Sequence, residues 1–283
     1  MTGRLPSWLK VRAPGGPGYV ETSATVRELG LHTVCQEARC PNIGECWGNR
    51  TATFMLLGDT CTRNCNFCAV THGRPLTVDP HEPGRVADAV RRLGLRHVVV
   101  TSVNRDDLPD GGAGHFAATA RAIREWIPAC RVEVLVPDFQ GNLEAVAAVT
   151  AAPIDIFNHN LETVPRLYRR VRPGARYERS LAVLGSARRA GAGLLTKAGL
   201  MLGLGETTDE LLSVFGELRK VGCDILTLGQ YLRPSAEHLA VERYVPPEEF
   251  SSLRDEAVRL GFRHVEAGPL VRSSYHAWSH VPD

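Results

Sequence analysis

The chain lacks the features that would direct it to a membrane or to a polyanion. It contains no run of roughly 18 apolar residues, the length that a transmembrane helix needs, and its N-terminal stretch has no apolar segment of signal-peptide length. The formal net charge is only +2, with 33 Lys and Arg against 31 Asp and Glu. Such a balance favours neither nucleic acid nor an anionic membrane as a partner. The sequence therefore predicts a soluble, cytoplasmic protein whose 283 residues suffice for a large α/β domain.

Cysteine is plentiful by comparison, but its distribution argues against disulfides. Six of the eight cysteines lie between positions 35 and 68, whereas disulfide-stapled domains spread their cysteines along the chain. Without a secretory signal, the compartment is expected to be reducing. The other two, Cys130 and Cys223, adjoin apolar runs, so we predict that they are buried and unreactive.

From residue 51 onward, short β-branched apolar runs alternate with longer amphipathic segments. The short runs are typical of buried parallel strands, and the longer segments are typical of helices. Six such units predict an α/β fold, either a partial barrel or a doubly wound sheet, which periodicity alone does not separate. The predicted strands lie at 51–58, 97–103, 131–136, 154–160, 193–202 and 224–232, and the predicted helices at 84–95, 114–127, 141–152, 162–171, 207–222 and 246–261.

Polar residues gather where the predicted strands end. In a barrel, the strand ends face one mouth, which is where active sites lie. Any one of these clusters alone is typical of a solvated turn, but several together favour a site. The candidates for the mouth are Asn104, Arg105, Asp106 and Asp107 after the second strand, Asn158 and Asn160 after the fourth, and Gly203, Gly205 and Glu206 after the fifth.

Two groups of three cysteines carry the strongest functional signal. "TVCQEARCPNIGECWG" has the spacing C-x4-C-x5-C, and "GDTCTRNCNFCAVTHG" has the spacing C-x3-C-x2-C. A structural zinc ion and a [4Fe–4S] cluster each take four ligands, so three thiolates leave one position open for a substrate or cofactor. The pattern therefore indicates chemistry rather than electron storage. The first group is Cys35, Cys40 and Cys46, and the second is Cys61, Cys65 and Cys68.

The second group, with Phe67 directly before its last cysteine, resembles the signature of the radical S-adenosylmethionine superfamily. Within that superfamily, the first group together with "GPLVRSSYHA" (268–277) resembles the lipoyl synthase family. The similarity extends from about residue 33 to 277. It is also carried by "TSVNRDDLPDGGAGHF", "NHNLETV", "GLMLGLGE" and "LTLGQYLRPS".

The resemblance implies a partial (β/α)6 TIM-like barrel. We expect this barrel at residues 51–265, after an N-terminal extension at 1–50 that carries the first cysteine group. Residues 1–50 lack clear periodicity, which is typical of an extension wrapped on a body. A C-terminal tail at 266–283 would carry the Arg-Ser-Ser-Tyr motif.

The implied reaction is radical-mediated insertion of two sulfur atoms at C6 and C8 of a protein-bound octanoyl chain, which forms the lipoyl cofactor. No side chain can deprotonate an unactivated carbon, so a cofactor must supply the radical. The implied cofactors are two [4Fe–4S] clusters and two molecules of S-adenosylmethionine per lipoyl group. By resemblance, Cys61, Cys65 and Cys68 hold the cluster that generates the radical. Cys35, Cys40 and Cys46 then hold an auxiliary cluster that donates sulfur, with Ser274 as its fourth ligand and Ser273 as the alternative.

Further roles are assigned to residues at the predicted mouth. Phe67, Asn158, Asn160, Gly203 and Glu206 are the expected contacts of S-adenosylmethionine, with the substrate amide as the alternative partner of Asn158 and Asn160. The expected partners are octanoylated lipoyl carrier domains, namely the acyltransferase subunits of 2-oxoacid dehydrogenases and the glycine cleavage H protein. A ferredoxin or flavodoxin as electron donor and a cluster-repair protein complete the set. Among the remaining candidates, Arg272 is expected to orient the serine motif or contact the carrier, and Lys197 to form a salt bridge rather than act in catalysis.

Three alternatives stay open at this point. A sulfur-inserting enzyme of the biotin-synthase type would need different auxiliary ligands. A two-cluster electron carrier needs neither a large barrel nor an open iron. A zinc-stabilised binding module would be colourless when purified.

Overall fold

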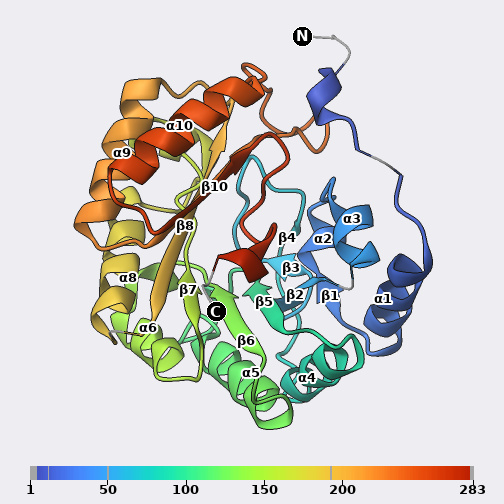
Figure 1. The fold of residues 1–283 in the computed structure, drawn as a ribbon. Coiled ribbons are helices and arrows are strands. Elements are labelled where there is room, and N and C mark those ends of the chain that lie inside the picture. Colours follow the sequence, from blue (N-terminus) through green and yellow to red (C-terminus); the bar gives the residue numbers. More distant parts are fainter. Residues whose placement is uncertain (1–4, 12, 50, 192, 281–283) are drawn as a thin grey trace.

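A computed structural model describes residues 5–11, 13–49, 51–191 and 193–280, and its central feature is an eight-stranded sheet (Figure 1). All neighbouring strands are parallel except β1, which runs antiparallel to β2. The order is β1 (His32–Thr33), β2 (Thr53–Leu56), β5 (His97–Ser102), β6 (Arg131–Leu135), β7 (Ile156–Asn158), β8 (Leu195–Leu202), β9 (Ile225–Gln230) and β10 (His264–Gly268).

The strand order decides between the two architectures that the sequence left open. From β2 to β10 the strands follow one another in chain order, without the reversal that defines a doubly wound sheet. Figure 1 shows the sheet curving around an interior, with the long helices outside it. The protein is therefore a partial (β/α) barrel. The covering helices are α4 (Glu82–Arg92), α5 (Ala113–Trp126), α6 (Leu143–Thr150), α8 (Tyr177–Arg189), α9 (Thr208–Lys220) and α10 (Pro247–Arg259).

Burial explains why the periodic pattern predicted these elements correctly. Val98, Val99 and Val100 of β5 are each at most 3% exposed, as a strand covered on both faces requires. Each outer helix buries only one stripe, such as Val86 and Val90 of α4. Among the described residues, no helix has the length and apolar character needed to cross a membrane.

The helix predicted at 162–171 is wrong. Glu162 has a left-handed backbone (φ 68°) and bridges to Leu200 of β8, and Pro165 follows shortly after. Only a 3-10 turn, η3 (Pro165–Leu167), and one helical turn, α7 (Tyr168–Val171), form there. The crossover helix is α8, which the sequence analysis did not predict.

The first 50 residues contain more structure than their weak periodicity suggested. They form η1 (Ser7–Leu9), α1 (Pro17–Glu28), α2 (Val34–Glu37) and α3 (Ile43–Gly48), and β1 joins the edge of the sheet. At the other end, β10 spans the predicted boundary at residue 265, so the division into three parts stays a prediction. The remaining short elements are β3 (Thr60–Cys61), β4 (Thr71–His72), η2 (Phe139–Gly141) and η4 (Ala277–Ser279).

The C-terminal segment folds back against the barrel after β10. A Cβ atom at Gly229 of β9 would lie 2.1 Å from the carbonyl oxygen of Val271, so only glycine lets the segment approach this closely. On its other side, the segment is tied to the N-terminal region. There Asn42 Nδ2 donates to the Leu270 carbonyl at 2.7 Å, and the Tyr275 hydroxyl donates to Glu45 at 3.1 Å. The segment therefore connects the barrel to the first 50 residues.

Lys197 forms the salt bridge that the sequence predicted. Its fully buried ammonium donates to Glu133 Oε1 at 2.8 Å, and its Nζ lies 3.0 Å from Nδ1 of His280. Burial alone would raise the pKa of Glu133, but the Lys197 ammonium reverses this effect and holds that pKa at about 2. The pair is therefore an ionised bridge between β6 and β8.

Replacing Lys197 by alanine should destabilise the fold strongly, because it leaves the buried carboxylate of Glu133 with only His97 as an ion-pair partner among the described residues, and Nε2 of His97 lies 3.6 Å from Glu133 Oε2. We expect the free energy of unfolding to fall by about 3–5 kcal/mol, measured by denaturant titration. Lys220→Ala, at the exposed end of α9, is the control and should change it by less than about 0.5 kcal/mol. Equal stability of the two variants would contradict the assignment.

Candidate active site

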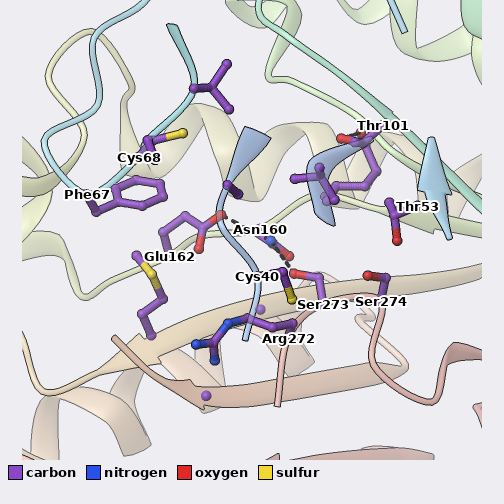
Figure 2. Close-up of a pocket in the computed structure, with 18 of the residues that line it drawn as sticks. Cys40, Thr53, Phe67, Cys68, Thr101, Asn160, Glu162, Arg272, Ser273 and Ser274 are labelled. Carbon is purple, nitrogen blue, oxygen red and sulfur yellow. Dashed lines mark hydrogen bonds between the residues drawn. The ribbon is translucent and has the colours of Figure 1, made fainter. Parts of the chain in front are cut away.

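A cavity of about 490 Å³ lies at the carboxyl ends of the barrel strands. Its walls include Thr101 and Ser102 at the end of β5, Leu135 of β6 and Gln230 of β9. All six clustered cysteines line it, together with the three residues Arg272, Ser273 and Ser274. Figure 2 labels Cys40, Cys68 and these three residues. The cavity therefore collects the sequence motifs from three distant parts of the chain.

The loop that carries the second cysteine group is fixed by its neighbours. Cys61 ends β3, and its sulfur accepts the backbone N–H groups of Arg63 (3.4 Å) and Asn104 (3.3 Å). The Arg63 guanidinium binds both oxygens of Asp106 (2.6 and 2.8 Å) and Asp138 Oδ1 (2.7 Å). These contacts join the loop to the ends of β5 and β6 and so fix the position of Cys61.

The first cysteine group faces the cavity from the N-terminal region. Cys35 lies in α2 and Cys46 in α3, while Cys40 lies in the turn between these two short helices. Figure 2 shows Cys40 close to Ser273 and Arg272 and apart from Phe67 and Cys68. The labelled cysteine of each group therefore lies in a different part of one space.

The protonation of the thiols is set mainly by their burial. Burial raises the pKa of Cys35 to about 11 and that of Cys46 to about 12, and the neighbouring thiols of the same group add to the Cys46 shift. Burial likewise raises the pKa of Cys68 to about 12, with Cys65 and Cys61 adding to it. Metal ligation needs thiolates, so iron has to displace these protons. Three converging thiols in each group fit a cluster with one open iron.

The structure separates the other predicted site residues into two sets. Phe67, Asn104 and Asn160 line the cavity. The remaining predicted cofactor contacts and mouth residues are not among the lining residues: Asn158, Gly203, Gly205, Glu206, Arg105, Asp106 and Asp107.

Several of the residues that do not line the cavity stabilise the strand ends around it instead. Asn158 is fully buried and donates to Glu133, whereas Glu206 accepts the backbone N–H groups of Gly203 and Leu204. Gly203 has φ 96°, and an added Cβ would lie 2.3 Å from Gln230 Nε2. The glycine therefore permits a tight turn at the end of β8.

The sequence analysis missed several charged residues of the cavity, namely Arg39, Arg63, Glu162, Arg172 and Arg233. The Arg172 guanidinium donates to the carbonyls of Asn160 (2.8 Å) and Leu161 (3.2 Å) and lies near Cys65. Burial raises the pKa of Glu162, while the nearby Arg172 acts in the opposite direction. "NHNLETV" contained the signal for Glu162, but the predicted helix at this place obscured it.

Solved structures of low sequence identity share the fold. Methylornithine synthase (PylB) aligns with a TM-score of 0.52 at 13% identity, covering 87% of this chain and 81% of that protein. SuiB from Streptococcus suis aligns with a TM-score of 0.59 at 10% identity, covering 80% of this chain and 52% of that protein. These likenesses support the barrel and say nothing further about the activity.

Sequence comparison is more specific. Residues 55–218 match the profile described as "Radical SAM superfamily", and residues 2–40 match the "N-terminal domain of lipoyl synthase of Radical_SAM family". The lipoyl synthase of Rubrobacter xylanophilus is 60% identical over 278 residues, covering 98% of this chain and 87% of the relative. That of Caldanaerobacter subterraneus is 56% identical, covering 98% and 97%. Neither a zinc module nor an electron carrier accounts for a match of this extent, and the chain belongs to the lipoyl synthase family of the radical S-adenosylmethionine superfamily.

Proposed function

We propose that the cavity is the site where this chain carries out the lipoyl synthase reaction, with one cysteine group serving each cluster. The reaction inserts two sulfur atoms at C6 and C8 of a protein-bound octanoyl chain and so forms the lipoyl cofactor. The enzyme uses two [4Fe–4S] clusters and S-adenosylmethionine, and the auxiliary cluster is the sulfur donor. The observation that carries the proposal is that both cysteine groups and the Arg-Ser-Ser-Tyr segment border one cavity.

The proposed ligands follow from the two cysteine groups of this cavity. Cys61, Cys65 and Cys68 hold the cluster at which S-adenosylmethionine binds. Cys35, Cys40 and Cys46 hold the auxiliary cluster, with Ser274 as the fourth ligand. Alkoxide is a harder ligand than thiolate and a poorer match for iron–sulfur centres, so a serine suits a position that has to be released. When bound, these cofactors supply hydrogen-atom abstraction and sulfur transfer.

The chain itself has to orient the substrate and keep water away from the radical. Met55, Leu135, Leu200 and Met201 give the cavity apolar walls, which suit an octanoyl chain. Side chains of this kind exclude water from the reacting carbons. The apolar walls therefore both contact the octanoyl chain and keep water away from the carbons that react.

The cofactor contacts remain part of the proposal. Phe67 is proposed to lie against the adenine of S-adenosylmethionine, and Asn160 to face the cofactor side of the cavity; both line it. For Asn158, Gly203 and Glu206 we propose a supporting role, in which they fix the ends of β7 and β8. The hydrogen bonds and the tight turn described above favour that role.

The protein acts on lipoyl carrier proteins. We propose the identity of these carriers, the other protein partners and the cellular compartment in which the reaction takes place. The carriers would be the acyltransferase subunits of 2-oxoacid dehydrogenases and the glycine cleavage H protein. A ferredoxin or flavodoxin would deliver electrons, and a cluster-repair protein would restore the auxiliary cluster. A cytoplasmic location is supported by the eight cysteines, all described and all unpaired, which fit a reducing compartment.

Mass spectrometry of an octanoyl-lysine peptide tests the proposal. The peptide is incubated anaerobically with reconstituted protein, S-adenosylmethionine and a reductant, and a gain of two sulfur atoms is expected. If 5′-deoxyadenosine accumulates without any sulfur in the peptide, the radical activity stands and the substrate assignment fails. If a protein with intact clusters yields neither product, the proposed reaction is wrong.

A further inference from the structure

Asn160 connects the two sides of the cavity by hydrogen bonds. Its Nδ2 donates to Glu162 Oε1 at 3.1 Å and to Ser273 Oγ at 2.5 Å. Asn160 and Glu162 follow β7 in the barrel, whereas Ser273 lies 113 residues later, in the segment after β10. Figure 2 shows these side chains at the centre of the cavity, with Ser274 beside Ser273. One amide thus joins the barrel to the serine motif.

The orientation of this amide is fixed by its neighbours. The NH₂ group of Asn160, rather than its oxygen, faces Glu162 Oε1. The amide oxygen packs against Gly199 of β8, where an added Cβ would lie 2.7 Å from it. Asn160 is only 7% exposed, so the surrounding protein rather than bulk water determines its contacts. Its second N–H is therefore directed at Ser273.

Glu162 is itself held in an unusual backbone conformation. Its φ of 68° is uncommon for a residue with a side chain, and such strain persists only where the surroundings impose it. Its N–H donates to the Gly199 carbonyl at 2.9 Å, and its carbonyl accepts the N–H of Met201 at 2.8 Å. β8 therefore fixes Glu162, and Glu162 in turn fixes the amide of Asn160.

The two serines differ in what their hydroxyl groups contact. The Ser273 oxygen accepts the bond from Asn160. The Ser274 hydroxyl has no hydrogen-bond partner within the described ranges of the chain, although it lines the same cavity as Cys35, Cys40 and Cys46. One serine is thus engaged by the barrel and the other is left for a ligand.

We propose that Asn160 is a positioning residue for the auxiliary centre: by engaging Ser273, it fixes the segment so that Ser274 is presented to Cys35, Cys40 and Cys46. This inference rests on the proposed function, which assigns the auxiliary cluster to those thiols and a serine. The bonds of Asn42 and Tyr275 anchor the segment to the N-terminal region only. Without Asn160, the barrel side of the serine motif loses its hydrogen bond, and either hydroxyl can turn toward the cluster.

The test measures how firmly the auxiliary cluster holds its serine-bound iron. In full-length protein whose Cys61, Cys65 and Cys68 are replaced by alanine, only the auxiliary cluster is reconstituted. Mössbauer spectra report the ligand set, and the rate of [3Fe–4S] formation under mild oxidation, followed by electron paramagnetic resonance, reports loss of the unique iron. We compare this background with Asn160→Ala, Ser273→Ala, their combination and Ser274→Ala, and we record a melting curve for each.

Asn160→Ala and Ser273→Ala should each speed iron loss by about ten-fold, the effect of losing one hydrogen bond. Their combination should be no faster than either alone, because both remove the same bond. Ser274→Ala should lose the iron fastest and change the Mössbauer spectrum. If Asn160→Ala does not fold, Ser273→Ala still carries the test, because its ten-fold effect is expected on its own.

Two other outcomes separate the inference from the proposed function. Suppose that Ser274→Ala changes the Mössbauer spectrum, but Asn160→Ala and Ser273→Ala lose iron at the same rate as the parent protein that lacks the second cysteine group. The positioning role is then wrong, while the serine ligand stands. Effects of Asn160→Ala and Ser273→Ala that multiply in the combined variant also overturn it, since Asn160 would then act on something other than Ser273. If Ser274→Ala matches the background, the serine assignment fails and the inference fails with it.

Discussion

Replacing Cys65 by alanine should abolish the cleavage of S-adenosylmethionine. The proposed radical-site cluster has only three protein ligands, since its fourth iron has to stay open for the cofactor. Removing one thiol leaves two, which is too few to retain the cluster, so no electron can reach the sulfonium.

The measurement is the yield of 5′-deoxyadenosine from anaerobically reconstituted protein and dithionite, together with the iron content. Cys65→Ala should give no 5′-deoxyadenosine above background and should retain about half of the iron, since one of two four-iron clusters remains. Cys130→Ala is the matched control, because this buried thiol lies outside the cavity and should leave both quantities unchanged. Wild-type amounts of 5′-deoxyadenosine from Cys65→Ala would remove the second cysteine group from its assigned role.

How much of this fold could be predicted depended on the kind of signal that each element carries. β5 was predictable because three consecutive valines are typical of a strand buried on both faces. β10 was not, because His264 and Glu266 are only partly buried and interrupt any apolar run. The segment after β7 was misread because Val164, Leu167, Tyr168 and Val171 have helical spacing, while the backbone of Glu162 and the ring of Pro165 prevent one continuous helix.

The candidate site shows the same division. That the six clustered cysteines border one cavity could be anticipated from residue type and spacing, because few roles other than metal binding need three cysteines so close together. The hydrogen bond between Asn160 and Ser273 could not, since it joins residues 113 positions apart and forms only when the segment after β10 folds back against the barrel. The clamp of Arg63 on Asp106 and Asp138 likewise depends on three strand ends meeting. Residue type and spacing therefore indicate local chemistry, whereas contacts between distant strand ends and the C-terminal segment depend on how the whole chain folds.

Replacing Cys40 by alanine should separate the two halves of the reaction. Cys40 lies beside Arg272 and Ser273 and apart from Cys68. Its loss should remove the auxiliary cluster and leave the radical-site thiols with their Arg63 clamp intact. The variant should therefore still produce 5′-deoxyadenosine while inserting no sulfur into an octanoyl-lysine peptide.

Both products are measured in the same reaction by mass spectrometry, with Cys223→Ala as the control for a buried thiol outside the cavity. The control should give both products at wild-type levels. Normal lipoyl product from Cys40→Ala would mean that the sulfur comes from elsewhere than the first cysteine group. Loss of both products would mean that the two sides of the cavity fold or load as one unit. Only the predicted split, radical formation without sulfur transfer, requires two clusters with separate tasks.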